Sequence, residues 1–280
     1  MIQSLFSGVS GMLSNQTEMD VIGNNIANAN TTGFKGGRAN FTESFLQISR
    51  AATPNQPVSL GVGLGVQVDS TETNFNQGAF QTTNVPTDMG INGNGFFAVQ
   101  SVNGTDYSTR NGAFVEDSQG FLRTTDGNYV MGVAGATAPA GATAGFPPDK
   151  LQIPTTVSPS NSPVVSFSVD PTGTITVTGQ DGSTQVTGYI TLQNYSNPNG
   201  LSDVGQGLYA YEPSAGTNQY FPADSAGVGT IQTGVLEASN VDLSNEFANM
   251  IIAQRGFEAS ARVITVSDTM LQTVTNLKTQ

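Results

Sequence analysis

Apolar residues recur at alternating steps of three and four near both ends of the chain. Near the N-terminus they are Ile2, Leu5, Val9, Met12, Met19 and Ile26, and near the C-terminus they are Leu243, Phe247, Met250, Phe257, Ala261, Ile264 and Leu271. This spacing predicts two long helices, each with a narrow apolar seam. Because such a seam must pack against another helix, we expect both ends of the chain to need helical partners.

Cap and turn residues set the limits of these helices. The first is expected to end at the turn near Asn28, and the last to begin near Asp242, a favourable N-cap. Gly8, Gly11 and Gly23 lie inside the first helix, where each costs ~0.5–1 kcal/mol relative to Ala. Either these glycines let another helix approach closely, or they are tolerated weak points in a terminal helix.

The middle of the chain has the pattern of short strands joined by tight turns. Strand-like runs include 96–99, 174–178 and 189–192, and the turn dipeptides are Asn92-Gly93, Asn94-Gly95, Asn103-Gly104, Asp126-Gly127, Asp181-Gly182 and Asn199-Gly200. A stretch rich in Gly, Ala and Pro, from Gly135 to Pro148, is expected to be a long surface loop. The fold class is therefore predicted to be α+β, with long terminal helices packed as a coiled-coil-like pair and an inserted antiparallel all-β domain.

Four segments follow from this pattern. Residues 1–34 hold the N-terminal helix, 35–87 a connector and extended arm, 88–229 the β-rich domain, and 230–280 a strand and the C-terminal helix. Inside the connector, Pro54 and Pro57 indicate an irregular exposed segment, and residues 61–68 alternate with the period of a strand. The role of the 46–61 connector is left open.

Composition removes most kinds of catalytic chemistry. The chain has neither cysteine nor histidine, so a cysteine nucleophile, the commonest general base and the commonest metal ligand are missing. Only 11% of residues are charged, and the net charge is −12. An acidic chain with nine scattered cations is a poor candidate for nucleic-acid binding. An uncharged polar surface is compatible with close packing against neighbouring copies, and equally with an ordinary extracellular-style surface.

The remaining candidate sites are weak, and we expect no catalytic, metal or cofactor site. The glycine-rich run at 61–66 lacks the GxGxxG spacing of a nucleotide site, and the loops at Asp126 and Asp170 lack the ligand pattern of a calcium loop. Asp106 and Glu116 could form a glycosidase pair, because that mechanism needs no histidine. A carboxylate-dependent hydrolase and a secreted adhesin or binding module remain as alternatives.

Targeting patterns are not recognisable in the sequence. The first basic residue is Lys35, and the opening residues lack the apolar core of a cleaved secretory signal. No apolar run approaches the ~18 residues of a membrane helix. We expect the chain either to stay in the cytosol or to leave by a route without such a signal.

Several motifs resemble those of the bacterial flagellar rod and hook axial proteins. They are Ser7-Gly-Val-Ser-Gly-Met12, Asp20-Val-Ile-Gly-Asn-Asn-Ile-Ala-Asn28, Thr32-Gly-Phe-Lys35, Ile91-Asn-Gly-Asn-Gly-Phe-Phe97, Tyr107-Ser-Thr-Arg-Asn-Gly112, Leu236-Glu-Ala-Ser-Asn-Val-Asp-Leu243 and Asn249-Met-Ile-Ile-Ala-Gln-Arg-Gly-Phe257. They occur in the family's order and span nearly the whole chain. The resemblance implies that the terminal helices of many copies form inner tubes around a channel, with the β domain outside.

The resemblance also implies function and partners. The terminal motifs look most similar to those of short hook proteins, which form the tubular hook and transmit motor torque to the filament. The distal rod protein, a drive-shaft subunit of the basal body, is the alternative. The implied partners are other copies of the chain, neighbouring rod and hook-filament junction proteins, the hook cap and the flagellar type III export apparatus. Neither nucleic acid nor a small-molecule substrate is implied.

The expected assembly interface combines the apolar helix positions with polar motif residues. It consists of Leu5, Val9, Met12, Met19, Ile22, Asn24, Asn25, Ile26, Asn28, Phe34, Asn240, Asp242, Leu243, Phe247, Met250, Ile251, Gln254, Arg255, Phe257, Ile264 and Leu271. The apolar members should bury surface at roughly 25 cal/mol per Å². Most of this gain is expected only on assembly.

Overall fold

The computed structural model describes residues 2–50, 60–139, 141–158, 160–225 and 227–278. Within these ranges the chain forms two long helices and a large set of antiparallel strands, which confirms the expected α+β class. The chain divides into two compact units. The helical unit comprises residues 1–29, 36–74 and 241–280, and the β unit comprises residues 30–35 and 75–240.

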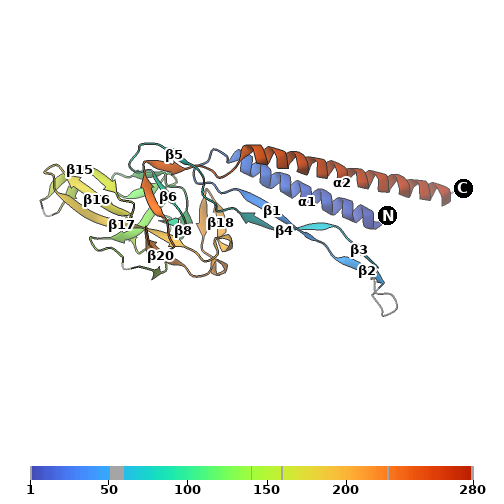
Figure 1. Ribbon diagram of the computed structural model, residues 1–280, viewed down its shortest axis with the longest axis horizontal. Coiled ribbons are helices and arrows are strands. Elements are labelled where there is room, and N and C mark those ends of the chain that lie inside the picture. The colour runs from blue at the N-terminus through green and yellow to red at the C-terminus, as the bar shows by residue number, and fades with distance from the viewer. Residues whose placement is uncertain (1, 51–59, 140, 159, 226, 279–280) are drawn as a thin grey trace. The chain divides into compact units, whose positions relative to one another are not determined.

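Helices α1 (Ile2–Ala27) and α2 (Leu243–Lys278) lie side by side in the helical unit (Figure 1). Asp242 directly precedes α2, and its Oδ1 accepts a hydrogen bond from the backbone N–H of Ser244 at 2.9 Å. This geometry confirms the predicted N-cap, which satisfies one of the free donors in the first turn. Helix α1 ends at the predicted turn, just before Asn28.

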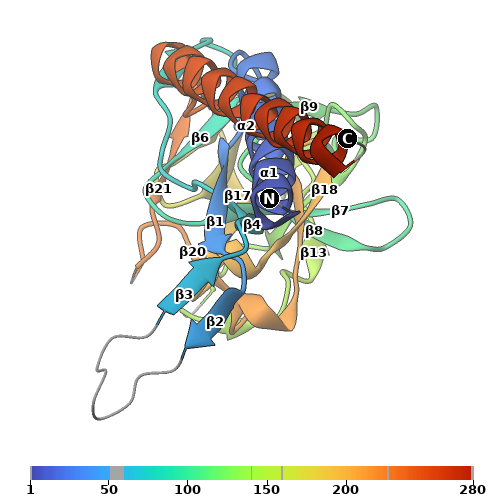
Figure 2. The same ribbon diagram turned by 90° about the vertical axis from the view of Figure 1, so that its right-hand side faces the viewer.

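An extended two-stranded arm completes the helical unit. Strand β1 (Gly37–Glu43) pairs with β4 (Val66–Thr73), and β2 (Leu46–Arg50) pairs with β3 (Leu60–Gly63), both antiparallel. In both views α1 lies between α2 and the β1–β4 ribbon (Figures 1 and 2). The arm is formed by the two halves of the predicted connector, and the expected strand at 61–68 is present as parts of β3 and β4. Pro54 and Pro57 lie outside the described residues.

Eighteen strands are described in the β unit. They are β5 (Phe80–Thr82), β6 (Met89–Asn92), β7 (Phe96–Gln100), β8 (Asp106–Thr109), β9 (Phe114–Glu116), β10 (Leu122–Thr124), β11 (Tyr129–Ala134), β12 (Thr143–Ala144), β13 (Asp149–Lys150), β14 (Thr156–Val157), β15 (Ser162–Val169), β16 (Thr174–Gly179), β17 (Thr184–Asn194), β18 (Ser202–Gly205), β19 (Leu208–Ala210), β20 (Gln219–Pro222), β21 (Thr230–Thr233) and β22 (Val235–Glu237). Among these residues, 14 strands form one sheet, whose main path runs β14-β15-β16-β17-β11-β7-β8-β19-β18. Strands β21 and β6, and likewise β22 and β5, form separate pairs.

The predicted turns account for several of these hairpins. Asn103-Gly104 connects β7 with β8, and Asp181-Gly182 connects β16 with β17, with positive φ at both glycines. Asn199-Gly200 differs, because Pro198 starts a short 3₁₀ helix, η1 (Pro198–Gly200), at this place. The expected loop from Gly135 to Pro148 also contains strand β12, which pairs with β20.

The β unit has a main apolar core and a smaller aromatic cluster. The core is formed by alternate residues of the strands, including Met89, Ile91, Phe97, Phe114, Leu122, Ile190, Leu192 and Ile231. Each such fully buried side chain contributes about 1.5–3 kcal/mol by transfer from water. The aromatic cluster contains Phe96, Tyr195 and Tyr209, with Phe75 packed edge-on against Phe96 and Tyr209. The β unit therefore has its own hydrophobic interior.

Candidate assembly surfaces

Glycines allow α1 and α2 to approach closely. A Cβ atom added to Gly8 would lie 3.0 Å from Ile264 Cγ1, and one added to Gly11 would lie 2.9 Å from Ser260 Oγ. Around Gly23 there is nothing within 4 Å. The close-approach interpretation is therefore confirmed for the first two glycines, and the helix that approaches them is α2 of the same chain. Among the described residues no helix of the same chain approaches Gly23, so for this glycine the interpretation stays a prediction about neighbouring copies.

Other small residues continue this line of contact. A Cβ on Gly256 would lie 2.6 Å from Asn15 Oδ1, and the hydroxyls of Ser4 and Ser267 are 3.2 Å apart. Ala253 is completely buried. The line between the helices, here called the small-residue seam, differs from the apolar seam that the residue spacing predicts. Because glycine and serine bring the backbones close together, larger apolar side chains are displaced to its flanks.

Many large apolar side chains on the two helices are consequently exposed. Phe6 is 63% exposed, Leu13 59%, Phe247 52% and Ile252 66%. Farther along α2, the exposed residues are Val263, Val266, Met270, Val274 and Leu277. Helical periodicity alone did not select Phe6, Leu13 or Ile252, because they lie beside the predicted seam and not on it. Their exposure leaves apolar area for which the helical unit offers no cover.

The predicted apolar interface residues have different degrees of burial. Val9, Leu243, Phe247 and Ile251 are exposed, Ile22 is buried, and the half-buried residues are Leu5, Met12, Met19, Ile26, Met250, Phe257, Ile264 and Leu271. All lie on α1 or α2. Part of the surface of these side chains is covered by the helix pair and part is exposed to solvent. The exposed part remains available for contacts with other molecules.

The predicted polar residues mostly make contacts within the chain. Asn25 is buried; its Nδ2 donates to Gly37 O at 2.7 Å, and its Oδ1 accepts from Gly37 N at 2.9 Å. Its Nδ2 also lies 3.3 Å from Glu246 Oε1, so this one side chain ties α1 to both β1 and α2. Asn28 Nδ2 donates to Asn24 Oδ1 at 2.9 Å.

The remaining predicted interface residues, which include the apolar Phe34, lie on α2, directly before it, or in the β unit. Arg255 forms an exposed ion pair with Glu258 at 3.0 Å. Asn240 N donates to Phe34 O at 3.4 Å, which joins the two ends of the β unit. Asp242 and Gln254 are exposed, whereas Phe34 and Asn240 are half-buried.

A buried ion cluster, not identified from the sequence, also holds the two ends of the β unit. Lys35 Nζ lies 2.6 Å from Glu237 Oε1, with both side chains fully buried. Arg110 Nη1 lies 3.5 Å from Glu237 Oε2. Gly78 N donates to Glu237 Oε1 at 2.8 Å, and Gly33 N donates to the Glu237 carbonyl at 2.7 Å. This cluster is called the Glu237 clamp below.

Burial has a clear electrostatic effect on the Glu237 clamp. Desolvation lowers the pKa of the Lys35 ammonium, while the adjacent Glu237 carboxylate acts in the opposite direction. Two buried cations share one carboxylate, and Arg110 is further held by Gly93 O at 2.9 Å and by the face of Phe96. Such a cluster requires every member, because removing one leaves uncompensated charge in the interior.

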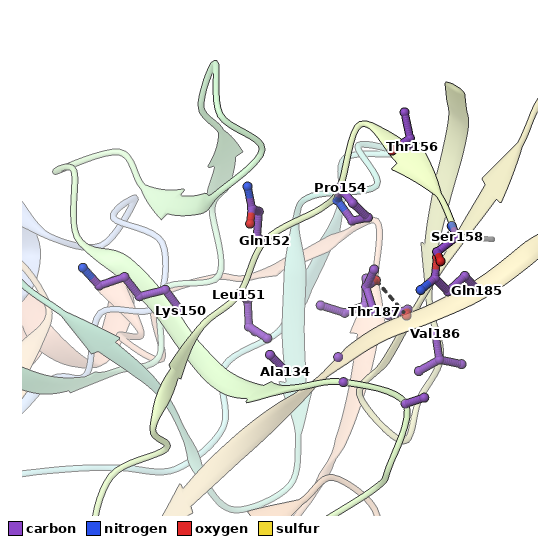
Figure 3. A pocket seen from close by; sticks show the side chains of 14 residues that line it. Ala134, Lys150, Leu151, Gln152, Pro154, Thr156, Ser158, Gln185, Val186 and Thr187 are labelled. Atoms are coloured by element: carbon purple, nitrogen blue, oxygen red, sulfur yellow. Dashed lines mark hydrogen bonds between the residues drawn. The ribbon is translucent and has the colours of Figure 1, made fainter. Parts of the chain in front are cut away.

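Two surface hollows show no constellation suited to hydrolysis. The first, about 390 Å³, has Lys150 as its one charged lining residue, and this side chain extends away from most of the others (Figure 3). The second, about 480 Å³, contains Glu116 but not Asp106. Asp106 instead accepts a hydrogen bond from Gln100 at 2.8 Å. The structure therefore does not bring the predicted carboxylate pair together in either hollow.

Among the described residues there is no group of three His, Cys, Asp or Glu residues able to hold a metal ion. Within the same ranges, neither helix combines the length and hydropathy needed to cross a membrane.

Family models match the chain at both ends and in the β unit. The model for flagella basal body rod proteins matches residues 5–35, and the model for the flagellar hook protein FlgE/F/G D1 domain matches residues 90–177. The model for the C-terminal part of flagellar basal body rod FlgEFG proteins matches residues 232–277. The flagellar basal-body rod protein FlgG of Bacillus subtilis is 38% identical over 287 residues, covering 99% of this chain and 100% of the relative. The chain belongs to the flagellar rod and hook protein family.

Other members of the family bear on the choice between rod and hook. The flagellar basal-body rod protein FlgG of Borreliella burgdorferi is 34% identical over 286 residues, with all of both chains covered. The flagellar hook protein FlgE of the same organism is 27% identical over 442 aligned residues, covering 99% of this chain and 100% of the relative. These similarities favour the rod alternative over the hook interpretation drawn from the motifs. The relatives are rod and hook proteins of the flagellum, and no enzyme family is indicated.

The Glu237 clamp and the small-residue seam both join residues of the two terminal segments that the family models match. Lys35 falls in the N-terminal match and Glu237 in the C-terminal match, although they are separated by 202 positions. Gly8 and Gly256, from opposite sides of the small-residue seam, lie in the same two matches. The terminal regions of this flagellar protein are thus joined twice, once in each unit.

Proposed function

We propose that this chain is the distal rod subunit of the bacterial flagellum, which polymerises into the drive shaft of the basal body. The observation that carries the proposal is full-length similarity to rod proteins, at 38% and 34% identity with 99–100% coverage. The hook subunit is the alternative, supported by the hook relative at 27% identity. That alignment extends over 442 positions, many more than the 280 residues of this chain.

Assembly is proposed to use the apolar flanks of the helix pair. Phe247 and Ile252 on α2 are more than half exposed, as are Phe6 and Leu13 on α1. Covering such side chains with helices of neighbouring copies would remove apolar surface from water, and coiled-coil-like packing is the arrangement suited to long helices. In this proposal residues 1–34 and 230–280 form the inner part of a tube, 88–229 the outer part, and 35–87 the connection.

The same proposal includes a location and assembly partners. A distal rod subunit would lie in the periplasmic part of the flagellum, next to other rod and hook proteins, and a hook subunit would lie outside the cell. The chain is proposed to pass through the flagellar type III export apparatus without a cleaved signal peptide. If it is a hook subunit, the hook cap and the hook-filament junction proteins become further partners.

Deleting the gene and imaging isolated basal bodies distinguishes rod from hook. Truncated rods are expected if the chain is the distal rod subunit, and expression from a plasmid should restore full-length rods. Complete rods that lack hooks would contradict the distal rod assignment and support the hook. Purified chain that stays monomeric under all salt and seeding conditions would contradict both.

A further inference from the structure

Positive charge is scarce on the β unit. Residues 30–35 and 75–240 contain twelve acidic residues and four basic ones. Two of the four, Lys35 and Arg110, are buried in the Glu237 clamp, with side-chain exposures of 0% and 4%. The surface cations of this unit are therefore Arg123 and Lys150, surrounded by an excess of carboxylates.

Both surface cations lie on one aromatic ring. Arg123 Cζ and Lys150 Nζ are each 4.0 Å from the centroid of the Tyr129 ring. The strands explain this convergence, because β10 and β13 both pair with β11, which carries the tyrosine. Phe121 packs edge-on against the same ring, with centroids 5.7 Å apart. Arg123, Tyr129 and Lys150 are together called the cationic platform.

The two cations of the platform differ in what they already bind. Arg123 Nε donates to Asp117 Oδ2 at 2.8 Å, and its Nη2 donates to the Tyr129 hydroxyl at 2.5 Å. Lys150 is exposed, and no carboxylate of the described residues lies within ion-pair distance of it. The tyrosine ring restricts the lysine by a cation–π contact and leaves its N–H donors available. A restricted ammonium loses less entropy on binding an anion than a freely moving one.

We propose that the cationic platform binds an acidic loop on the β unit of a second copy of this chain. Identical acidic units repel one another when packed side by side, and Lys150 offers a place where a neighbour's carboxylate meets an opposite charge. Charge complementarity within a single kind of subunit favours another copy over an unrelated anion. The inference rests on the proposed function, because it requires the chain to polymerise.

Zero-length crosslinking tests the contact directly. Assembled protein made from equal amounts of unlabelled and ¹⁵N-labelled chains is treated with a carbodiimide, which joins an amine to a carboxylate that touches it. Mass spectrometry is expected to find Lys150 joined to an Asp or Glu of residues 75–240, in pairs that mix the two labels. Lys150 left unmodified, or joined only within its own chain, would overturn the proposal.

A matched pair of variants supplies a second measurement. Lys150→Gln and Asn103→Asp each make the net charge more negative by one unit at an exposed position of the β unit, and only the first removes the platform's free cation. Lys150→Gln is expected to raise the critical concentration for polymerisation by about 2–5-fold at low salt, as for one exposed ion pair. The difference from wild type should shrink as salt screens the contact, and Asn103→Asp should behave as wild type.

The remaining outcomes separate this inference from the proposed function. Wild-type protein that polymerises while Lys150→Gln matches Asn103→Asp would overturn the platform contact and leave the filament function standing. Wild-type protein that never polymerises would overturn both. If Lys150→Gln abolishes binding to a probe anion, such as polyglutamate or inorganic phosphate, but leaves polymerisation unchanged, the platform serves a ligand other than a second copy.

Discussion

Glu237 makes several ionic and hydrogen-bond contacts through a single buried side chain. Its carboxylate is fully buried, lies 2.6 Å from Lys35 Nζ and 3.5 Å from an Arg110 nitrogen, and accepts from Gly78 N. The interior of the β unit therefore holds more positive than negative charge at this place. Neutralising the carboxylate would leave two cations without a counter-ion in a region that water does not reach.

Replacing Glu237 by Gln is expected to destabilise the β unit by about 3–5 kcal/mol, the usual cost of breaking a buried ion pair. The change keeps the size of the side chain and one acceptor oxygen, so the loss would report charge. Denaturant unfolding monitored by tyrosine fluorescence measures it. Glu212→Gln, at an exposed position, is the control and should change stability by less than about 0.5 kcal/mol. An unfolding midpoint of Glu237→Gln equal to wild type would contradict the clamp.

The Asp181 carboxylate is expected to make the stability of the folded state depend on pH. Hydrogen bonds from the Ser183 hydroxyl and the Ser183 backbone N–H lower the pKa of Asp181 from 3.8 to about 2. A carboxylate whose pKa is lower in the folded state stabilises it fully above pH 3.8, and this contribution is lost as the pH falls through about 2. Ser183→Ala should move the pKa back towards 3.8, as followed by NMR of the carboxyl carbon.

The conservative variant separates hydroxyl bonding from packing at this turn. Ser183→Thr retains the donor and should leave the Asp181 pKa near 2. A pKa that is the same in wild type and in Ser183→Ala would show that the hydroxyl is not the main cause of the shift.

At the scale of elements, two glycines of α1 allow the close contact between the helices to be tested. Gly8 and Gly23 belong to the same helix, yet only Gly8 faces α2 closely. Gly8→Leu is expected to destabilise the helix pair by about 1–3 kcal/mol through overpacking. Gly23→Leu should not, since there is space at that position and leucine is the better helix former. Thermal dissociation of the assembled polymer, followed by circular dichroism, compares the two variants.

An equal dissociation temperature for Gly8→Leu and wild type would mean that the two helices do not approach closely in the assembled protein. A large loss for Gly23→Leu would place a partner of another copy at that position.

Elements governed by local chemistry were predicted well from the sequence. The limits of α1 and α2 follow from Asn28 and Asp242, and the hairpin at Asp181-Gly182 follows from a residue pair that tolerates positive φ. Long-range pairing could not be predicted in this way. Glu237 meets Lys35 across 202 positions of sequence, and nothing near either residue specifies the other. The scarcity of basic residues is the one signal that could have drawn attention to Lys35, Arg110, Arg123 and Lys150.

The seam composition was missed for a related reason. Helical periodicity ranks large apolar residues above small ones, so it selected Val9 and Phe247, which are exposed. Ser4, Gly8 and Gly256 carry little hydrophobic signal, and they pack the helices because they are small.

At the scale of the whole molecule, the two units are expected to differ in stability as a free monomer. The β unit has a large apolar core, whereas the helix pair leaves large apolar side chains in solvent, with Ile252 and Leu277 66% and 75% exposed. In dilute solution, residues 3–28 should therefore exchange amide hydrogen rapidly and become protected on polymerisation. Hydrogen exchange with mass spectrometry measures both states, and strong protection of this segment in dilute monomer would contradict the prediction.

Phe247→Asp extends the same test to assembly. This residue is 52% exposed on α2, so a charge there should prevent helices of neighbouring copies from covering it. The variant is expected to lose polymerisation and to keep the unfolding midpoint of the β unit. Polymers that form at the wild-type concentration would show that this face is not covered in the assembly.

The Glu237 clamp is also expected to affect the timing of folding. Ser4 and Ser267 meet across 263 positions of sequence, and closing so long a loop between two free ends is entropically unfavourable and slow. Once Gly33 and Glu237 are joined, however, the end of α1 and the start of α2 are separated by only a few residues of chain on each side of the contact. We therefore expect folding of the β unit to bring the two ends of the chain together and so to lower the entropic cost of pairing the terminal helices.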